Sequence, residues 1–167
     1  MAHFIDCPME SSMSLLTVSN KIIKPQDEIL FRPMLGIDKD GETVRKVYME
    51  IEFKDYYFVI FFFPMDFKVD SSEILSFKEH IADFSKNNCK IVGVTSDSPL
   101  AIKRWISKDV SGGGFGGPVG FPILSDKDLS LSMSIGVARD CGMPARATFI
   151  IDWTGVRSAG LSRTSSG

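Results

Sequence analysis

The sequence is poor in the residues on which metal sites and disulfide frameworks depend. Its 167 residues include three cysteines, Cys7, Cys89 and Cys141, and two histidines, His3 and His80. The cysteines are odd in number and none belongs to a C-x-x-C pair, so neither a zinc ligand set nor a disulfide framework is predicted. We therefore expect no cofactor and no metal, and we expect the thiols to be reduced, as in cytoplasmic proteins.

Net charge and long apolar segments are also scarce. The formal net charge is −2 at pH 7, which gives no electrostatic reason to expect nucleic acid or an anionic membrane as a partner. Charged residues interrupt the first thirty positions, so that neither a signal peptide nor a membrane-spanning helix is predicted there: Asp6, Glu10, Lys21 and Lys24. A cytoplasmic location is the expectation.

The composition is typical of one soluble globular domain, with 44% hydrophobic and 24% charged residues. Residues 1–20 are rich in Met and Ser without a clear period, and we expect a poorly ordered N-terminal extension in which Cys7 is incidental. Residues 21–158 are expected to form the domain. Residues 159–167 have a loop-like composition and are expected to form a short C-terminal tail.

The strongest structural signal is an apolar run at residues 56–63, which ends at Pro64. Eight aromatic and β-branched residues stopped by a proline predict a strand buried on both faces. After a polar turn, apolar residues recur at helical spacing and predict one helix: Ile74, Phe77, Ile81 and Phe84. Asp70 followed by Glu73 has the spacing of a capping box, with Asp70 as N-cap and Glu73 reaching back to it.

Further elements are predicted on both sides of this strand and helix. A hairpin is expected at residues 29–35 and 43–47, with the turn at Asp40-Gly41. The elements expected afterwards are a buried strand at 91–96, a helix from Pro99 with Ile102, Trp105 and Ile106 on one side, a short helix at 128–136 with Leu129, Met133 and Ile135 as its apolar residues, a strand at 147–152 and a return at 156–158. Strand, helix and strand in succession indicate a parallel pair with a right-handed crossover.

The glycine-rich segment at residues 111–117 invites comparison with a phosphate-binding loop. It lacks the Gly-Lys-Ser/Thr ending of a P-loop, and it follows a helix where a dinucleotide-binding loop follows a strand. We therefore expect a connecting loop and no nucleotide site.

The segment Phe62-Phe63-Pro64-Met65-Asp66-Phe67-Lys68-Val69-Asp70-Ser71-Ser72-Glu73-Ile74 resembles the signature F-F-x-P-x-D-F-T-F-V-C-P-T-E-I of the peroxiredoxins, the thiol-specific antioxidant or alkyl hydroperoxide reductase C family. The segment is one residue shorter than the signature. Lys68 stands where the family has threonine, and the peroxide-reducing cysteine is absent. Depending on where the gap falls, Asp70 or Ser71 takes the cysteine's place.

Other stretches resemble the same family in the same order. Residues 93–105 resemble G-V-S-x-D-S and the following helix with its Trp, and residues 121–126 resemble I-P-L-x-S-D. Arg146 stands at the arginine that, in the family, holds the reactive thiolate and the peroxide. The resemblance spans about residues 20–158, and the family's C-terminal helix and resolving V-C-P have no counterpart in the sequence.

The resemblance implies an α/β, thioredoxin-like fold of the peroxiredoxin type, in which a mixed sheet has helices on both faces. Strands 57–63, 91–96 and 147–151 should then be nearly fully buried, Phe61 and Ile150 included. A homodimer is expected. The former active site, with Pro64, Lys68, Asp70, Ser71 and Arg146, is expected to persist as an ion pair between Asp70 and Arg146.

Two functional hypotheses remain open. In the first, the protein is a peroxidase-inactive member that keeps the fold as a binding or assembly module. In the second, it is an active redox enzyme that reduces hydroperoxides through Cys141, whose loop precedes Arg146, with thioredoxin as its reducing partner. Cys89, between a helix and a buried strand, is interpreted as a structural thiol.

Overall fold

The structure is a computed structural model that describes residues 31–64 and 71–152, and the backbone of residues 157–161. Residues 1–20, 68, 70 and 162–167, on which several predictions bear, lie outside the described residues. In chain order the elements are β1 (Met34–Ile37), β2 (Val44–Val47), α1 (Met49–Glu52), β3 (Tyr57–Phe62), α2 (Ser72–Glu79), α3 (Ile81–Lys86), β4 (Cys89–Thr95), α4 (Pro99–Ser107), a 3-10 turn (Val110–Gly112), β5 (Ile123–Ser125), α5 (Ser130–Ile135), β6 (Ala147–Ile151) and β7 (Arg157–Leu161).

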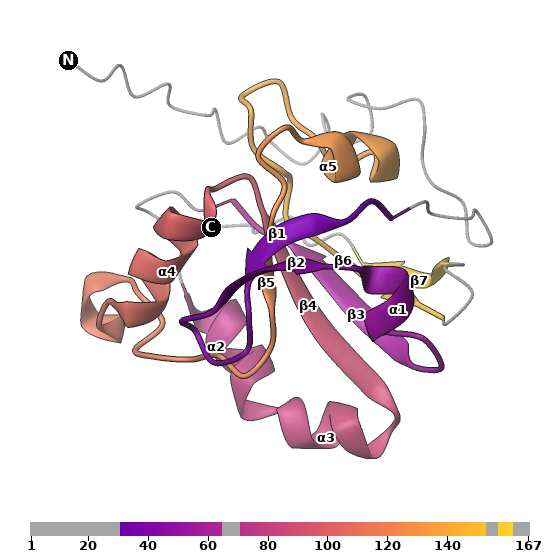
Figure 1. Cartoon of the computed structure of the whole chain (residues 1–167), viewed down its shortest axis with the longest axis horizontal. Coiled ribbons are helices and arrows are strands. Elements are labelled where there is room, and N and C mark those ends of the chain that lie inside the picture. The colour runs from indigo at the N-terminus through magenta and orange to yellow at the C-terminus, as the bar shows by residue number, and fades with distance from the viewer. Residues whose placement is uncertain (1–30, 65–70, 153–156, 162–167) are drawn as a thin grey trace.

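The strands form one mixed sheet of seven in the order β2-β1-β5-β4-β3-β6-β7 (Figure 1). The predicted parallel pairing of β3 with β4 is confirmed, and β5 adds a further parallel strand beside β4. The strands outside this central group pair antiparallel. The predicted hairpin is also confirmed, although its first strand begins at Met34 and not at Ile29.

Two apolar clusters cover the two faces of the sheet. One packs residues of α1 and α5, such as Met49 and Leu131, against one face. The other packs residues of α2 and α4, such as Ile74 and Ile102, against the opposite face. The chain therefore has the predicted α/β architecture with helices on both faces, which is the thioredoxin-like fold of the peroxiredoxins.

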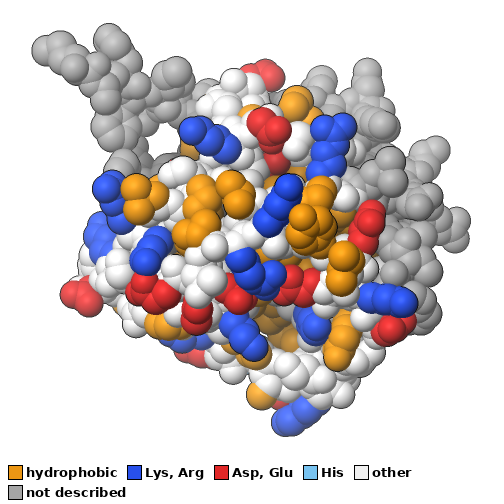
Figure 2. Space-filling model, viewed as in Figure 1, with side chains coloured by type: hydrophobic (Ala, Val, Ile, Leu, Met, Phe, Trp, Pro, Cys, Tyr) orange, Lys and Arg blue, Asp and Glu red, His pale blue; other side chains and the backbone are white. Residues whose placement is uncertain are grey.

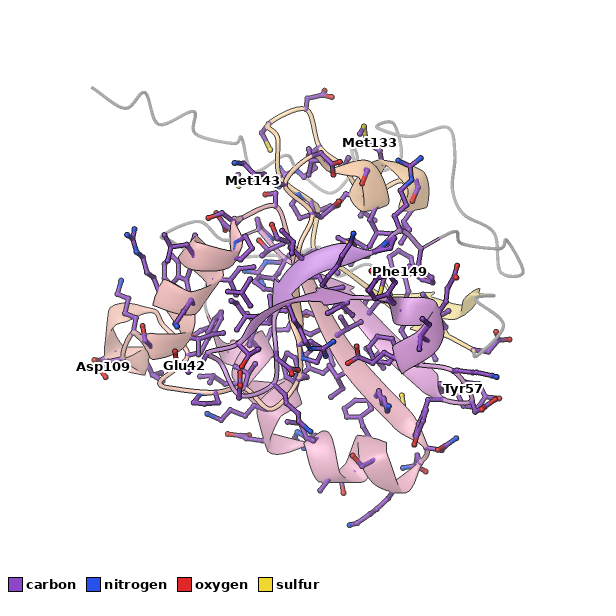
Figure 3. All side chains as sticks on the ribbon, in the orientation of Figure 1. Glu42, Tyr57, Asp109, Met133, Met143 and Phe149 are labelled. Carbon is purple, nitrogen blue, oxygen red and sulfur yellow. The ribbon has the colours of Figure 1, made fainter. Side chains whose placement is uncertain are left out.

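The aromatic run at residues 56–63 forms the centre of this sheet. Phe58 to Phe63 are buried, whereas Tyr56 and Tyr57 are 36% and 39% exposed. Tyr57 lies at the start of the strand (Figure 3). Phe61 stacks on Phe77 of α2, with ring centroids 4.5 Å apart. This contact joins the central strand to the helix that follows it and fixes where that helix lies.

The single helix predicted after Pro64 is two helices that meet at His80. The backbone of His80 leaves the helical region (φ −103°, ψ 9°), and its Nδ1 atom lies 2.8 Å from the carbonyl oxygen of Ser76. The apolar residues still face one side, since Ile74 is buried and three others pack partly buried against the same cluster: Phe77, Ile81 and Phe84. The spacing thus predicted the buried face correctly and missed the break.

The prediction that β6 is buried on both faces is wrong. Its residues alternate, with Phe149 and Ile151 buried and Ile150 38% exposed. Ile150 lies opposite Val59 on the face that α2, α3 and α4 cover, but the cluster under those helices contains no residue of β6. The helices therefore shield the middle of the sheet, and β6 buries only the face that turns towards α1 and α5.

Smaller differences concern short elements. No pattern in the sequence predicted α1 or β5. In α5 the buried residues are Leu131, Ser132 and Ile135, whereas Met133 is 59% exposed (Figure 3). None of the helices within the described residues has both the length and the apolar character needed to cross a membrane.

Candidate functional site

The candidate site lies where β3 ends and α2 begins, beside the start of β6. Phe63 and Pro64 continue β3 as buried residues, and Phe62 pairs with Ala147, the first residue of β6. This pairing brings Arg146, the residue before β6, to the same edge of the sheet. Lys68 and Asp70 belong to residues 65–70, which the structure does not describe.

Ser71 is the N-cap of α2, and only 7% of its surface is exposed. Its carbonyl oxygen accepts a hydrogen bond from the backbone N–H of Leu75 at 3.0 Å, and its side chain makes no capping hydrogen bond. The predicted N-cap at Asp70 is therefore wrong by one residue. The hydroxyl of Ser71 lies at the positive end of the helix dipole, the place where a thiolate or another anion is stabilised.

Arg146 is held by Glu73 in the first turn of α2. Its Nη1 donates to Glu73 Oε2 at 2.9 Å, and the two side chains are 23% and 30% exposed. The capping-box contact expected between Glu73 and the backbone of Asp70 involves a residue that the structure does not describe. The expected pair between Asp70 and Arg146 lies outside the described residues and stays a prediction, but Arg146 already has one carboxylate partner.

A second carboxyl group lies at the end of the neighbouring strand. Asp97 follows β4 and accepts a weak hydrogen bond from Thr95 Oγ1 at 3.4 Å. Burial raises the pKa of Asp97, and the hydrogen bond from Thr95 opposes this effect in part. The backbone carbonyl of Asp97 accepts a hydrogen bond from Ser125 Oγ at 2.6 Å, which ties the end of β4 to the end of β5.

Cys89 lies far from this edge of the sheet. It is the first residue of β4 and pairs with Tyr57, whereas Ala147 pairs with Phe62 at the other end of β3. Five residues of extended strand separate these two positions, a distance of about 16 Å. Burial raises the pKa of the Cys89 thiol, which fits the interpretation as a structural thiol.

Cys141 lies in a loop that leads towards Arg146. A bridge between Ala138 and Pro144 closes the loop, and the backbone N–H of Ala145 donates to Val137 O at 2.7 Å. Cys141 is disulfide-bonded, so the expectation of reduced thiols is wrong for this residue. In this state its sulfur is not a thiolate that can attack a peroxide.

The glycine-rich segment follows the end of α4, and its backbone N–H groups are already hydrogen-bonded, so they do not form a phosphate-binding loop. Its backbone N–H groups donate to carbonyl oxygens of the last turns of α4: Phe115 to Trp105, Gly116 to Lys108 and Gly117 to Ile106. The prediction of a connecting loop is therefore confirmed. The described residues also contain no group of three or more His, Cys, Asp or Glu side chains that could hold a metal ion.

The role of Glu73 is the part of the site that the sequence analysis missed. Glu73 stands at the glutamate of the family signature, so the signal was present in the motif, but it was attributed to helix capping. Of the predicted site residues, the structure brings Pro64, Ser71 and Arg146 to one edge of the sheet.

Comparisons with known proteins agree with this fold. The protein-family model described as "AhpC/TSA family" matches residues 33–157 of the chain. The chain is 41% identical over 119 residues to Peroxiredoxin-2 of Rattus norvegicus, which is 68% of this chain and 60% of that protein. It is 33% identical over 156 residues to the chloroplastic 2-Cys peroxiredoxin BAS1 of Spinacia oleracea, 87% of this chain and 58% of that protein.

Among solved structures, the chain is similar to the mitochondrial 2-Cys peroxiredoxin from Plasmodium falciparum. The TM-score is 0.78 with 25% identity, over 84% of this chain and 83% of that chain. The chain spans about three fifths of the length of the curated relatives named above. Because the family model covers well over half of the chain, this protein belongs to the AhpC/TSA family, the peroxiredoxins.

Proposed function

We propose that this chain is a peroxidase-inactive peroxiredoxin that keeps the family fold as a binding or assembly module. The observation that carries this proposal is the absence of cysteine from residues 64–74, where the family signature has its peroxide-reducing cysteine. Peroxide reduction requires a thiolate that attacks the terminal oxygen and becomes a sulfenic acid. Neither a carboxylate at Asp70 nor a hydroxyl at Ser71 can follow that cycle.

The positions of the remaining cysteines support the proposal. Cys89 is half-buried at the opposite end of the sheet from Arg146, and its raised pKa disfavours the thiolate. Cys141 is disulfide-bonded. Within the part of the chain that the structure describes, Arg146 and the first turn of α2 could stabilise an anion but have no reactive sulfur beside them.

One observation favours the alternative, an active enzyme that uses Cys141. Its loop is anchored by Ala145 directly before Arg146, so a reduced Cys141 thiol would have a cation close to it along the chain. Such an enzyme would need its disulfide reduced before each attack on a hydroperoxide, and thioredoxin would be the expected reductant.

A peroxide assay on the pre-reduced protein tests both functions. We expect no turnover of hydrogen peroxide in a thioredoxin-coupled assay, and no fast sulfenic acid formation with stoichiometric peroxide, as followed by mass spectrometry. Turnover that is lost in Cys141→Ser and kept in Cys89→Ser would contradict the proposed lack of peroxidase activity and establish catalysis through Cys141. Turnover kept in both variants would contradict both assignments.

A further inference from the structure

We draw no further inference here: the strongest candidate, the exposed apolar surface around α1 and the start of β3 formed by Tyr48, Ile51 and Tyr56 (Figure 2 shows apolar side chains among charges of both signs on the face that includes α1), carries nothing because no contact among the described residues shows what covers it.

Discussion

Arg146 Nη1 donates to Glu73 Oε2 at 2.9 Å and thereby joins the start of β6 to the first turn of α2. The two residues are 73 positions apart in the sequence. Both side chains are mostly shielded from water. The pair should therefore contribute more to stability than a fully exposed ion pair, and its desolvation cost should be smaller than that of a fully buried one. It joins the two segments that form the candidate site.

Replacing Glu73 by Gln should therefore destabilise the protein. The amide keeps the size of the side chain but removes the charge that pairs with the partly buried guanidinium. We expect a loss of about 1 kcal/mol in the free energy of unfolding, measured by urea denaturation.

Glu79→Gln is the matched control, because Glu79 is exposed at the other end of the same helix. Its carboxylate lies near the negative end of the helix dipole, so its replacement should change stability by no more than a few tenths of a kcal/mol, about the size of a surface effect. Equal losses in the two variants would show that the pair between Glu73 and Arg146 has no special weight.

Asp97 should lower the free energy of unfolding as the pH rises above about 3.8. Burial raises its pKa in the folded protein above the ordinary 3.8, so the folded state favours the protonated carboxyl. The stabilising contribution of the protonated group is fully present below 3.8 and is lost as the pH rises through the higher folded value. Asp97→Asn should accordingly be more stable than the wild type at pH 7, and the difference should shrink towards pH 3 in thermal unfolding.

Asp38 provides a control of opposite sign. A hydrogen bond from Arg45 lowers the pKa of Asp38, and Arg45 Nη2 donates to Asp38 Oδ1 at 3.1 Å. This contribution is present above 3.8 and is lost as the pH falls through the lower folded value. Asp38→Asn should therefore be less stable than the wild type at pH 7. If both Asn variants shifted stability in the same direction at pH 7, the assignment of the two pKa shifts would be wrong.

Gly36 should not tolerate a side chain where β1 meets β5. A Cβ atom there would lie 2.6 Å from the backbone carbonyl oxygen of Ile123, a group that cannot rotate away. Gly36→Ala should cost about 2 kcal/mol or more, because the paired strands must separate. Gly142→Ala serves as the control, since Gly142 has φ +79° with no atom within 4 Å, and backbone strain alone should cost about 1 kcal/mol. A Gly36→Ala protein as stable as the control would show that β1 and β5 are not held as the structure has them.

The elements with strong local signals were predictable from the sequence. The apolar run at residues 56–63 predicted β3, and Pro99 predicted the start of α4. In the structure Ser98 caps this helix, because its Oγ accepts a hydrogen bond from the N–H of Ala101. β5 has only three residues and is defined by its neighbours β1 and β4. Such short strands depend on pairing with distant segments, which periodicity does not reveal.

The errors at the site have a related cause. Spacing placed Glu73 in a capping box because that pattern needs only four consecutive residues, whereas its partner Arg146 is supplied by the tertiary fold. The exposure of Ile150 is also a tertiary effect, since an apolar strand does not reveal how far the covering helices extend. The family resemblance identified Arg146, but the neighbours of a side chain are set by packing.

The candidate site should activate a cysteine placed in it. Ser71→Cys would place a thiol at the N-cap of α2, 7% exposed and two residues from the partner of Arg146. The helix end and the guanidinium both favour the thiolate, so we expect its pKa to fall below the ordinary value of about 8.5.

Ser76→Cys is the control, because Ser76 is exposed in the middle of the same helix. With Cys89 replaced by Ser in both proteins, the thiolate absorbance should titrate at lower pH for Ser71→Cys, and stoichiometric peroxide should oxidise that thiol about tenfold faster at pH 7. Asp70→Cys separates the two alignments left open by the one-residue gap. If it reacts fast while Ser71→Cys behaves like the control, Asp70 stands at the position of the family's cysteine and the assignment to Ser71 fails.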